Sequence, residues 1–312
     1  MAPRSADEQQ NFDAALAAIA REEPLTEEHQ DALSLSLADD GDVEAFRDVW
    51  SKLSAPARAR AIRSLRNAAE ARLRLDYSAL NLLALADADP QVRIAGIEAA
   101  LEDRGPALFQ RLLQMVQTDP VGAVRRAAAE DLARFALFAE LEDLDQPDVA
   151  ALRTTLFQAV RNQQEEPGVR QAALGALGYF SDEAVAEELA AGFGERDLRV
   201  GAVRGMGRSA DPRWTDRLLP VLGSEDPDLR AEAAKALGEI EEERAVGPLA
   251  ELVDDPDEDV RVAAVHALAV IGGEEAREAL LYLLEDPNQK VRDAAEHGIS
   301  NLETDEDDGL DT

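Results

Sequence analysis

The chain has 312 residues and a formal net charge of −33, from 65 acidic and 32 basic side chains. This length predicts either two domains or a repeat array whose core grows along one axis. The charge opposes nucleic-acid binding, because affinity for a polyanion comes largely from basic groups that release its counterions. The lack of cysteine excludes disulfides, thiolate nucleophiles, sulfur-ligated zinc and iron–sulfur clusters.

The composition favours helices over sheets. Aromatic residues make up only 4 % of the chain, and alanine and leucine dominate the apolar set. No stretch approaches the roughly 18 uncharged apolar residues that a membrane span needs, and the first residues lack a signal pattern. We therefore expect an all-α protein in the cytoplasm.

The first 41 residues predict a capping helix pair. Ser5 and Glu8 have the spacing of a capping box that opens one helix, and Thr26 is placed to cap a second. We expect both helices within residues 7–38, a first domain of residues 1–41 and a repeat array over residues 42–302.

An arginine-rich segment follows, around a degenerate unit marked by Pro56, Arg60 and Ile62. At about 100° per residue, one helical face gathers four of its arginines. They are Arg60, Arg63, Arg66 and Arg74. This face predicts a docking site for an acidic partner, for an RNA backbone or for the chain's own residues 305–308. The alternative is a solvated face that the acids of residues 39–48 neutralise.

From residue 92 onward the chain repeats a Val-Arg or Leu-Arg pair followed by small residues. The anchor arginines are Arg93, Arg125, Arg170, Arg199, Arg230, Arg261 and Arg292. The last four are 31 residues apart, whereas the gap of 45 between the second and third contains an insertion around residues 141–148. We expect this insertion to be a loop or an extended helix. A near-constant period of this length predicts stacked helix pairs.

An acidic residue followed by proline precedes six of the seven anchors. The acids are Asp89, Asp119, Glu166, Asp226, Asp255 and Asp286. An acid can cap free N–H groups at a helix start, and proline is tolerated in the first helical turn. Each pair therefore predicts the start of the second helix of a unit. Gly272 and Gly273 predict the end of one such helix.

Amphipathic segments such as residues 245–253 and 276–284 lie before these starts, so one unit is two antiparallel helices. We predict a right-handed α-solenoid of about eight pairs, most regular from residue 166. A disordered acidic tail is expected over residues 303–312.

The acid-proline turn, the Val-Arg anchor and the alanine-rich second helix resemble HEAT repeats of the short bacterial and archaeal, phycobilisome-lyase-like kind. The resemblance covers residues 42–302. It implies a ladder in which the turn acid and the anchor arginine connect successive units. Carried onto this chain, the pairs are Asp226 with Arg230, Asp255 with Arg261 and Asp286 with Arg292, with Asp228, Asp257 or Asp259 as alternative partners.

The resemblance implies a non-catalytic scaffold or adaptor for another protein, without a cofactor. The alternative is a phycobilin-lyase-type enzyme or chaperone subunit. Deoxyhypusine hydroxylases resemble this architecture but place His-Glu pairs around two irons, whereas Gln30, Ala267 and Gly298 follow the three histidines here. HEAT-like DNA glycosylases need a strongly basic groove, which a net charge of −33 does not supply.

A charged column five residues after the anchor arginines is the second candidate surface. It reads Glu98, Glu130, Gly175, Arg204, Lys235, His266 and His297. Equivalent positions of a solenoid line up, so we expect a continuous stripe on the concave side. Arg208 lies one turn after Arg204 and adds to it.

The basic part of this column predicts a cationic track for an acidic peptide or a phosphate group. The alternative is a set of solvated positions balanced by Glu232 and Glu239. His266 and His297 lie one repeat apart without a third ligand, so no metal site is expected there.

The two tryptophans each occupy the first helix of a unit. Trp50 is expected to pack on the capping pair. Trp214 is surrounded by charged residues and would be an interface anchor if exposed, or a core residue if packed. We expect a monomer whose partner is another protein or an acidic peptide.

Overall fold

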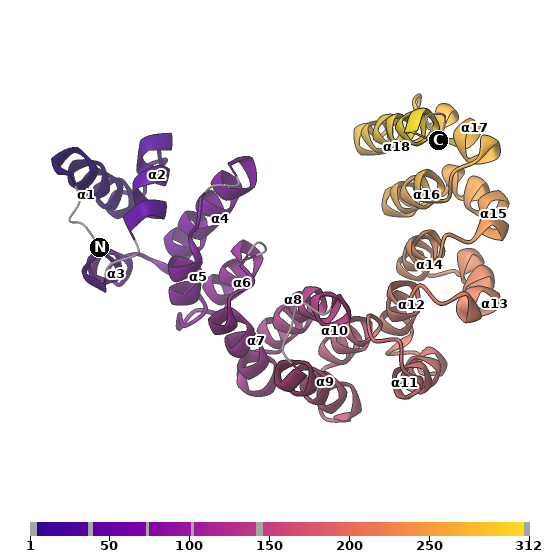
Figure 1. Ribbon diagram of the computed structural model, residues 1–312, viewed down its shortest axis with the longest axis horizontal. Coiled ribbons are helices and arrows are strands. Elements are labelled where there is room, and N and C mark those ends of the chain that lie inside the picture. The colour runs from indigo at the N-terminus through magenta and orange to yellow at the C-terminus, as the bar shows by residue number, and fades with distance from the viewer. Residues whose placement is uncertain (1–4, 37–39, 73–74, 101–102, 142–145, 309–312) are drawn as a thin grey trace. The chain divides into compact units, whose positions relative to one another are not determined.

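The computed structural model describes residues 5–36, 40–72, 75–100, 103–141 and 146–308. Within these residues the chain forms 18 α-helices and four short 3-10 helices, and no strand (Figure 1). Helix pairs follow one another along the chain, so the fold is an all-α solenoid, as predicted. The chain divides into two compact units, Met1–Phe135 and Ala136–Thr312.

The first unit contains seven helices and most of an eighth. They are α1 (Ala6–Ala20), α2 (Glu27–Ser36), α3 (Asp40–Trp50), α4 (Ala55–Ala71), α5 (Ser78–Ala84), α6 (Pro90–Ala99), α7 (Pro106–Thr118) and α8 (Gly122–Glu140). Ser5 and Glu8 form the predicted capping box of α1. Thr26 Oγ1 accepts a hydrogen bond from the His29 N–H at 3.3 Å, so the predicted second cap is also confirmed.

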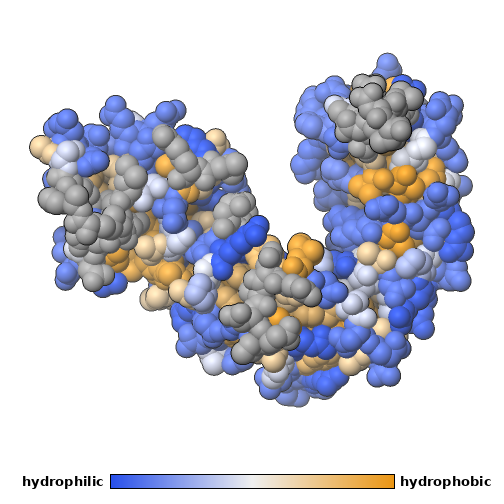
Figure 2. Space-filling model, in the orientation of Figure 1, coloured by the Kyte–Doolittle hydropathy of each residue, from blue (hydrophilic) through white to orange (hydrophobic). Residues whose placement is uncertain are grey.

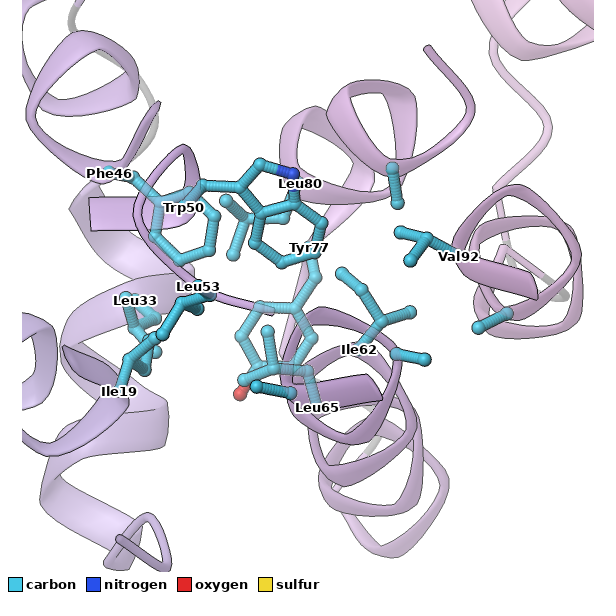
Figure 3. Packing of buried hydrophobic residues seen from close by; sticks show 14 of the residues in the cluster. Ile19, Leu33, Phe46, Trp50, Leu53, Ile62, Leu65, Tyr77, Leu80 and Val92 are labelled. Atoms are coloured by element: carbon cyan, nitrogen blue, oxygen red, sulfur yellow. The ribbon is translucent and has the colours of Figure 1, made fainter. Parts of the chain in front are cut away.

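A buried hydrophobic cluster holds α1 to α6 together (Figure 3). Trp50 packs against Phe46, with ring centroids 5.5 Å apart, and is 5 % exposed. Its indole N–H donates to Asp87 at 2.9 Å, which satisfies the one polar group of the buried ring. Ile19 and Leu33 of the capping pair belong to the same cluster, so Trp50 packs as expected.

The second unit contains ten helices. They are α9 (Gln146–Arg161), α10 (Pro167–Leu177), α11 (Glu183–Gly194), α12 (Arg199–Arg208), α13 (Thr215–Leu218), α14 (Pro227–Glu239), α15 (Val246–Glu251), α16 (Glu258–Ile271), α17 (Glu274–Leu283) and α18 (Gln289–Asp308). The 3-10 segments η1 (Pro212–Trp214), η2 (Leu219–Gly223), η3 (Glu243–Ala245) and η4 (Leu252–Asp254) flank α13 and α15.

Helices α10, α12, α14, α16 and α18 each pack on the next, and we call them the inner helices (Figure 1). Helix α16 ends at Ile271, and the next residue, Gly272, adopts a φ of 75°. This confirms the helix end predicted from Gly272 and Gly273. Helix α18 runs to Asp308 and so overlaps the segment expected to be a disordered tail. The tail and the domain boundaries at 41 and 302 stay predictions, and residues 309–312 lie outside the described residues.

The acid-proline pairs mark helix starts in two ways. Asp89 and Asp226 are N-caps whose carboxylates accept hydrogen bonds from backbone N–H groups, as predicted. Glu166 occupies an N-cap without a side-chain bond. In the other three units the helix begins three residues after the acid, because the turn is longer there. Those acids are Asp119, Asp255 and Asp286, and each is only 9 % exposed.

These buried acids receive the anchor arginine of the preceding unit. Arg230 binds Asp255 through two N–H groups at 2.7 and 2.8 Å. Arg261 binds Asp286 in the same way at 2.9 and 3.3 Å. In the first unit Arg93 and Asp119 form the equivalent pair, with both contacts at 2.8 Å. The ladder is therefore present at these three junctions between successive units.

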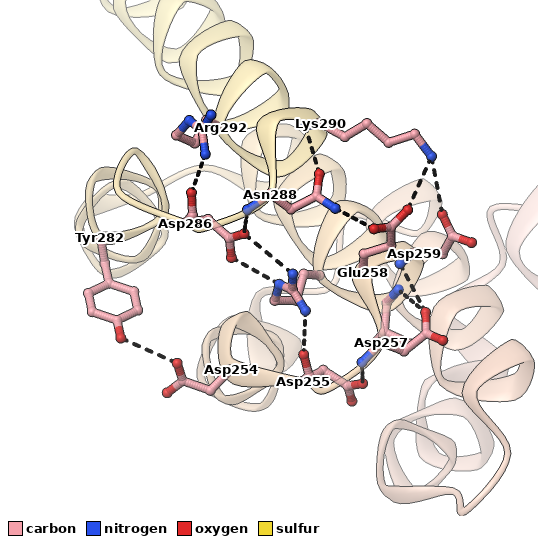
Figure 4. A network of polar contacts seen from close by, with 12 residues as sticks. Asp254, Asp255, Asp257, Glu258, Asp259, Tyr282, Asp286, Asn288, Lys290 and Arg292 are labelled. Carbon is pink, nitrogen blue, oxygen red and sulfur yellow. Dashed lines mark hydrogen bonds and ion pairs between the residues drawn. The ribbon is translucent and has the colours of Figure 1, made fainter.

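Anchor arginines also hold their own turns. Arg261 and Arg230 donate to the carbonyl six residues earlier, that of Asp255 at 2.7 Å and that of Ser224 at 2.8 Å. Arg170 instead donates to the Val160 carbonyl at 2.8 Å. Arg292 donates to the Asp286 carbonyl at 2.5 Å (Figure 4). One guanidinium thus ties its own turn to the turn of the next unit.

The particular pairs carried over from the family are wrong by one repeat. Asp255 pairs with Arg230 and not with Arg261, and Asp286 pairs with Arg261 and not with Arg292. The reason is geometric, because the Nε and Nη2 groups of Arg261 point to the carboxylate of the next unit. Only its Nη1 group points to its own turn, where it meets the Asp255 carbonyl. Asp226, offered for Arg230, instead caps α14. The alternative Asp257 caps α16.

Removing Asp255 tests the ladder. We expect Asp255→Ala to lower the free energy of unfolding by about 2 kcal/mol, between the effects typical of exposed and buried ion pairs, because the solenoid is only two helices thick. The control Asp216→Ala removes an exposed pair with Arg244, whose side chains are 86 % and 60 % exposed. Urea unfolding should leave the control midpoint unchanged. Equal midpoints for both variants would contradict the ladder.

Glycine allows the inner helices to approach closely. A Cβ atom built on Gly178 would lie 2.2 Å from the Gly205 carbonyl oxygen and 2.4 Å from its Cα. A Cβ on Gly201 would lie 2.7 Å from the Gln171 Cα. These neighbours are backbone atoms, so they cannot move aside as a flexible side chain would. The spacing of α10 and α12 therefore depends on these glycines.

We expect Gly178→Ala to destabilise the protein by about 2 kcal/mol, because overpacking forces the two backbones apart. The matched control is Gly194→Ala, since a Cβ there meets no atom within 4 Å. The control variant should be as stable as the wild type or slightly more stable, because alanine favours a helix. Thermal unfolding followed by circular dichroism measures both, and an unchanged Tm for Gly178→Ala would refute the close approach.

Candidate functional site

The candidate site is the exposed face of the inner helices in the second unit. Two sets of positions line it. We call the positions five residues after each anchor arginine the +5 column, and those nine residues after it the +9 column. In the second unit the +5 column is Gly175, Arg204, Lys235, His266 and His297, and the +9 column is Tyr179, Arg208, Glu239, Val270 and Asn301. The two sets are one helical turn apart, so they share a face.

Arg204 and Lys235 of the predicted track are joined by a carboxylate. Arg204 Nε donates to Glu232 Oε2 at 2.8 Å, and Lys235 Nζ donates to Glu232 Oε1 at 3.1 Å. Burial acts to raise the pKa of Glu232, but the hydrogen bond and charge of Arg204, with help from Lys235, lower it overall. Glu232 therefore balances the charges of Arg204 and Lys235, as the alternative prediction has it. The Lys235 side chain is nevertheless 53 % exposed.

Arg208 lies in a different environment. Its guanidinium carbon is 5.2 Å from the centroid of the Tyr179 ring, the geometry of a cation–π contact. A Cβ on Gly175 would lie 3.5 Å from Arg208 Nη1 and 3.1 Å from Arg204 Cδ, so both arginines lie over that glycine. Among the described residues Arg208 forms no ion pair, in contrast to Arg204.

Glu239 stands beside Arg208. Its Oε2 lies 2.3 Å from where a Cβ of Gly207 would be, so the carboxylate rests over that glycine. Desolvation raises the pKa of Glu239, and the positive charge of Arg208 opposes this shift without cancelling it. The two charges attract each other without a direct hydrogen bond.

The histidines end the track. His266 is exposed on α16, and His297 is exposed on α18, with its Nδ1 2.6 Å from the Asp293 carbonyl oxygen. Val270, in the +9 column of α16, is 58 % exposed, and an apolar patch lies over α16 on an otherwise mostly hydrophilic surface (Figure 2). Among the described residues no three acidic or histidine side chains gather in a way that would hold a metal ion.

The arginine face of α4 is neutralised. Arg60 pairs with Glu22, Arg63 Nε lies 3.9 Å from Glu98, and Arg66 donates to Glu70 at 2.9 Å. These acids, Glu22, Glu98 and Glu70, lie outside the segment 39–48 that the sequence offered as the neutralising one. Arg60 also borders a hollow of about 190 Å³ between α4 and the turn after α1. Arg74, the fourth arginine predicted on this face, lies outside the described residues.

Trp214 is 5 % exposed, so the packed alternative holds and an interface anchor is excluded. Arg213 and Arg217 lie over its ring, at 6.0 and 5.4 Å from the centroid. Tyr179 is the residue that the sequence reasoning missed. Its signal was available, because it occupies the same register after Arg170 as Arg208 does after Arg199.

Among the described residues no helix combines the length and the apolar character that crossing a membrane requires. The helix pairs and the repeated face define a helical-repeat protein. Residues 194–261 and 246–309 match the family model of HEAT repeats, so this part of the chain consists of HEAT repeats. The phycobilisome-lyase-like subtype stays a prediction. A comparison with curated proteins gave no match.

Several solved structures are similar to the chain. An engineered protein is 22 % identical over 63 % of this chain and 98 % of its own, with a TM-score of 0.40. The YibA protein of Escherichia coli is 14 % identical over 97 % and 99 %, with a TM-score of 0.40. Human deoxyhypusine hydroxylase is 20 % identical over 96 % and 98 %, with a TM-score of 0.35. Likenesses of this strength carry no information about function.

The charged contacts of Glu232 predict a pH dependence. Its folded pKa is lowered, so its contribution to stability is complete above the ordinary glutamate pKa of about 4.3 and is lost as the pH falls through the lower folded value. The stability difference between wild type and Glu232→Gln should therefore be constant near neutral pH and should shrink below pH about 4. Urea unfolding at pH 3 to 7 measures it, and a difference as large at pH 3 as at pH 7 would contradict the assignment.

Proposed function

We propose that the protein is a non-catalytic scaffold or adaptor that binds another protein along the inner helices of its second unit. The observation that carries this proposal is the pair of columns on one exposed face of helices that pack in direct succession. Such a face offers binding groups at a regular spacing, because each repeat moves the same position by one helix-packing distance of about 10 Å.

The rigidity of this face supports binding by a preformed surface. The anchor arginines tie successive turns together, and glycines let α10 and α12 pack in backbone contact. A surface that is already ordered loses little conformational freedom when a partner arrives, so more of the contact energy appears as affinity.

The charge supports a protein partner over a nucleic acid. Basic side chains of the face stand beside Glu232 and Glu239, and the whole chain carries −33 charges. A continuous polyanion would be repelled by this background, whereas a peptide can place single acids opposite single cations. We expect the protein to act as a cytoplasmic monomer without a cofactor.

The test is affinity purification of the tagged chain from its native cells, with an inner-face variant and a control. Arg208→Glu with Lys235→Glu reverses two cations of the face. The control Arg217→Glu reverses one exposed arginine on α13, outside the face. We expect the inner-face variant to lose a protein that the wild type and the control both retain.

Retention of every copurifying protein by the inner-face variant would refute the proposal. The alternative, a phycobilin-lyase-type enzyme or chaperone subunit, has no specific observation in its favour. A visible chromophore that copurifies with the wild type would nevertheless contradict the scaffold proposal and support that alternative.

A further inference from the structure

The Arg208 environment identifies the kind of segment that the inner face accepts. We propose that this face binds an extended acidic peptide segment of a partner protein. One carboxylate of the segment binds Arg208, which lies over the Tyr179 ring. The inference rests on the proposed function, since it names the chemistry of the partner at the same site.

The first argument is the contrast between two arginines on one helix. Arg204 has its carboxylate in Glu232, so its charge is matched within the fold. Arg208 lies over the Tyr179 ring, with its guanidinium carbon 5.2 Å from the centroid, and is ion-paired with no described residue. A cation–π contact with the ring leaves the N–H groups of the guanidinium available to bind a carboxylate through two hydrogen bonds.

The second argument is the missing side chain at Gly175. A Cβ there would lie 3.1 Å from Arg204 Cδ and 3.5 Å from Arg208 Nη1, so glycine leaves room for both arginines beside α10. Helix α12 contains three arginines and no acidic residue within Arg199–Arg208. With Lys235, the cations Arg204 and Arg208 outnumber the neighbouring acids Glu232 and Glu239, so an acidic ligand complements this part of a strongly acidic protein.

The spacing of the inner helices matches that of every third residue along an extended chain. Arg208, Lys235 and His266 come from three inner helices that pack in succession, α12, α14 and α16. Neighbouring packed helices are about 8–10 Å apart. An extended chain advances about 3.3 Å per residue, so every third residue meets the next helix. The favoured segment therefore carries acids three residues apart, and not in a continuous run.

Glu239 sharpens the inference. Its carboxylate attracts Arg208 without bonding to it and repels an incoming acid. Replacing it by glutamine removes the repulsion with little change in shape. Arg208→Gln should therefore weaken binding and Glu239→Gln should strengthen it, and a gain of affinity cannot arise from misfolding.

The experiment measures binding of a fluorescein-labelled nonapeptide by anisotropy at low salt, using the full chain. The probe has glutamate at its first, fourth and seventh positions and uncharged residues elsewhere. Its isomer has the three glutamates adjacent. Loss of one charge-assisted contact corresponds to an affinity change of about tenfold.

We expect the spaced probe to bind more tightly than its isomer, Arg208→Gln to bind it about tenfold more weakly and Glu239→Gln to bind it more tightly. Arg217→Gln is the matched control, because that arginine also lies over an aromatic ring, at 5.4 Å from the Trp214 centroid, but outside the face. It should bind as the wild type does.

Equal affinity for the two isomers, or unchanged binding by Arg208→Gln, would overturn this inference. A partner protein that depends on the inner face but is not displaced by the spaced probe would overturn the acidic-segment inference and leave the proposed function standing. If the spaced probe binds but the inner-face variant retains every partner protein, the face binds an acidic peptide and the proposed function is refuted.

Discussion

The anchor guanidinium links successive turns of this solenoid wherever the next unit supplies an acid at the equivalent position. It donates to the carbonyl six residues earlier and reaches the carboxylate at the equivalent position of the following unit, as Arg230 and Arg261 show. The acid at that position is buried by the contact, so neither charge is left unpaired. The pattern also includes Arg58 with Asp87. In three units the equivalent position holds an uncharged residue, namely Gln164, Phe193 or Ser224.

The close approach of the inner helices follows from residues that carry almost no side chain. Gly178 and Gly205 place the backbones of α10 and α12 in contact, which leaves the outward face of those helices narrow and well fixed. Arginines on that face then share a small area. Arg204 is matched by Glu232, whereas Arg208 is supported by the Tyr179 ring. The same packing that stabilises the array thus places Arg208 where it lies over an aromatic ring and forms no ion pair with a described residue.

Much of this was accessible from the sequence because repeats place equivalent residues in equivalent environments. The 31-residue period predicts the helix pairs, and the +5 column predicts which side chains share a face. Partners in space were harder to predict. The pairing of Asp255 was assigned to Arg261, its near neighbour in sequence, because nothing in a linear pattern shows that the side chain of Arg230 crosses to the next unit. Tyr179 lies in the +9 column, four residues beyond the +5 column that the pattern of charges marks.

The central claim is that partners bind the inner face of the second unit. Site-specific photocrosslinking in the native cells tests it most directly, with a photoreactive residue placed either at His266 on that face or at the exposed Glu278 on α17. The account predicts a discrete crosslinked protein from position 266 and none from position 278. Crosslinking from position 278 alone would contradict it.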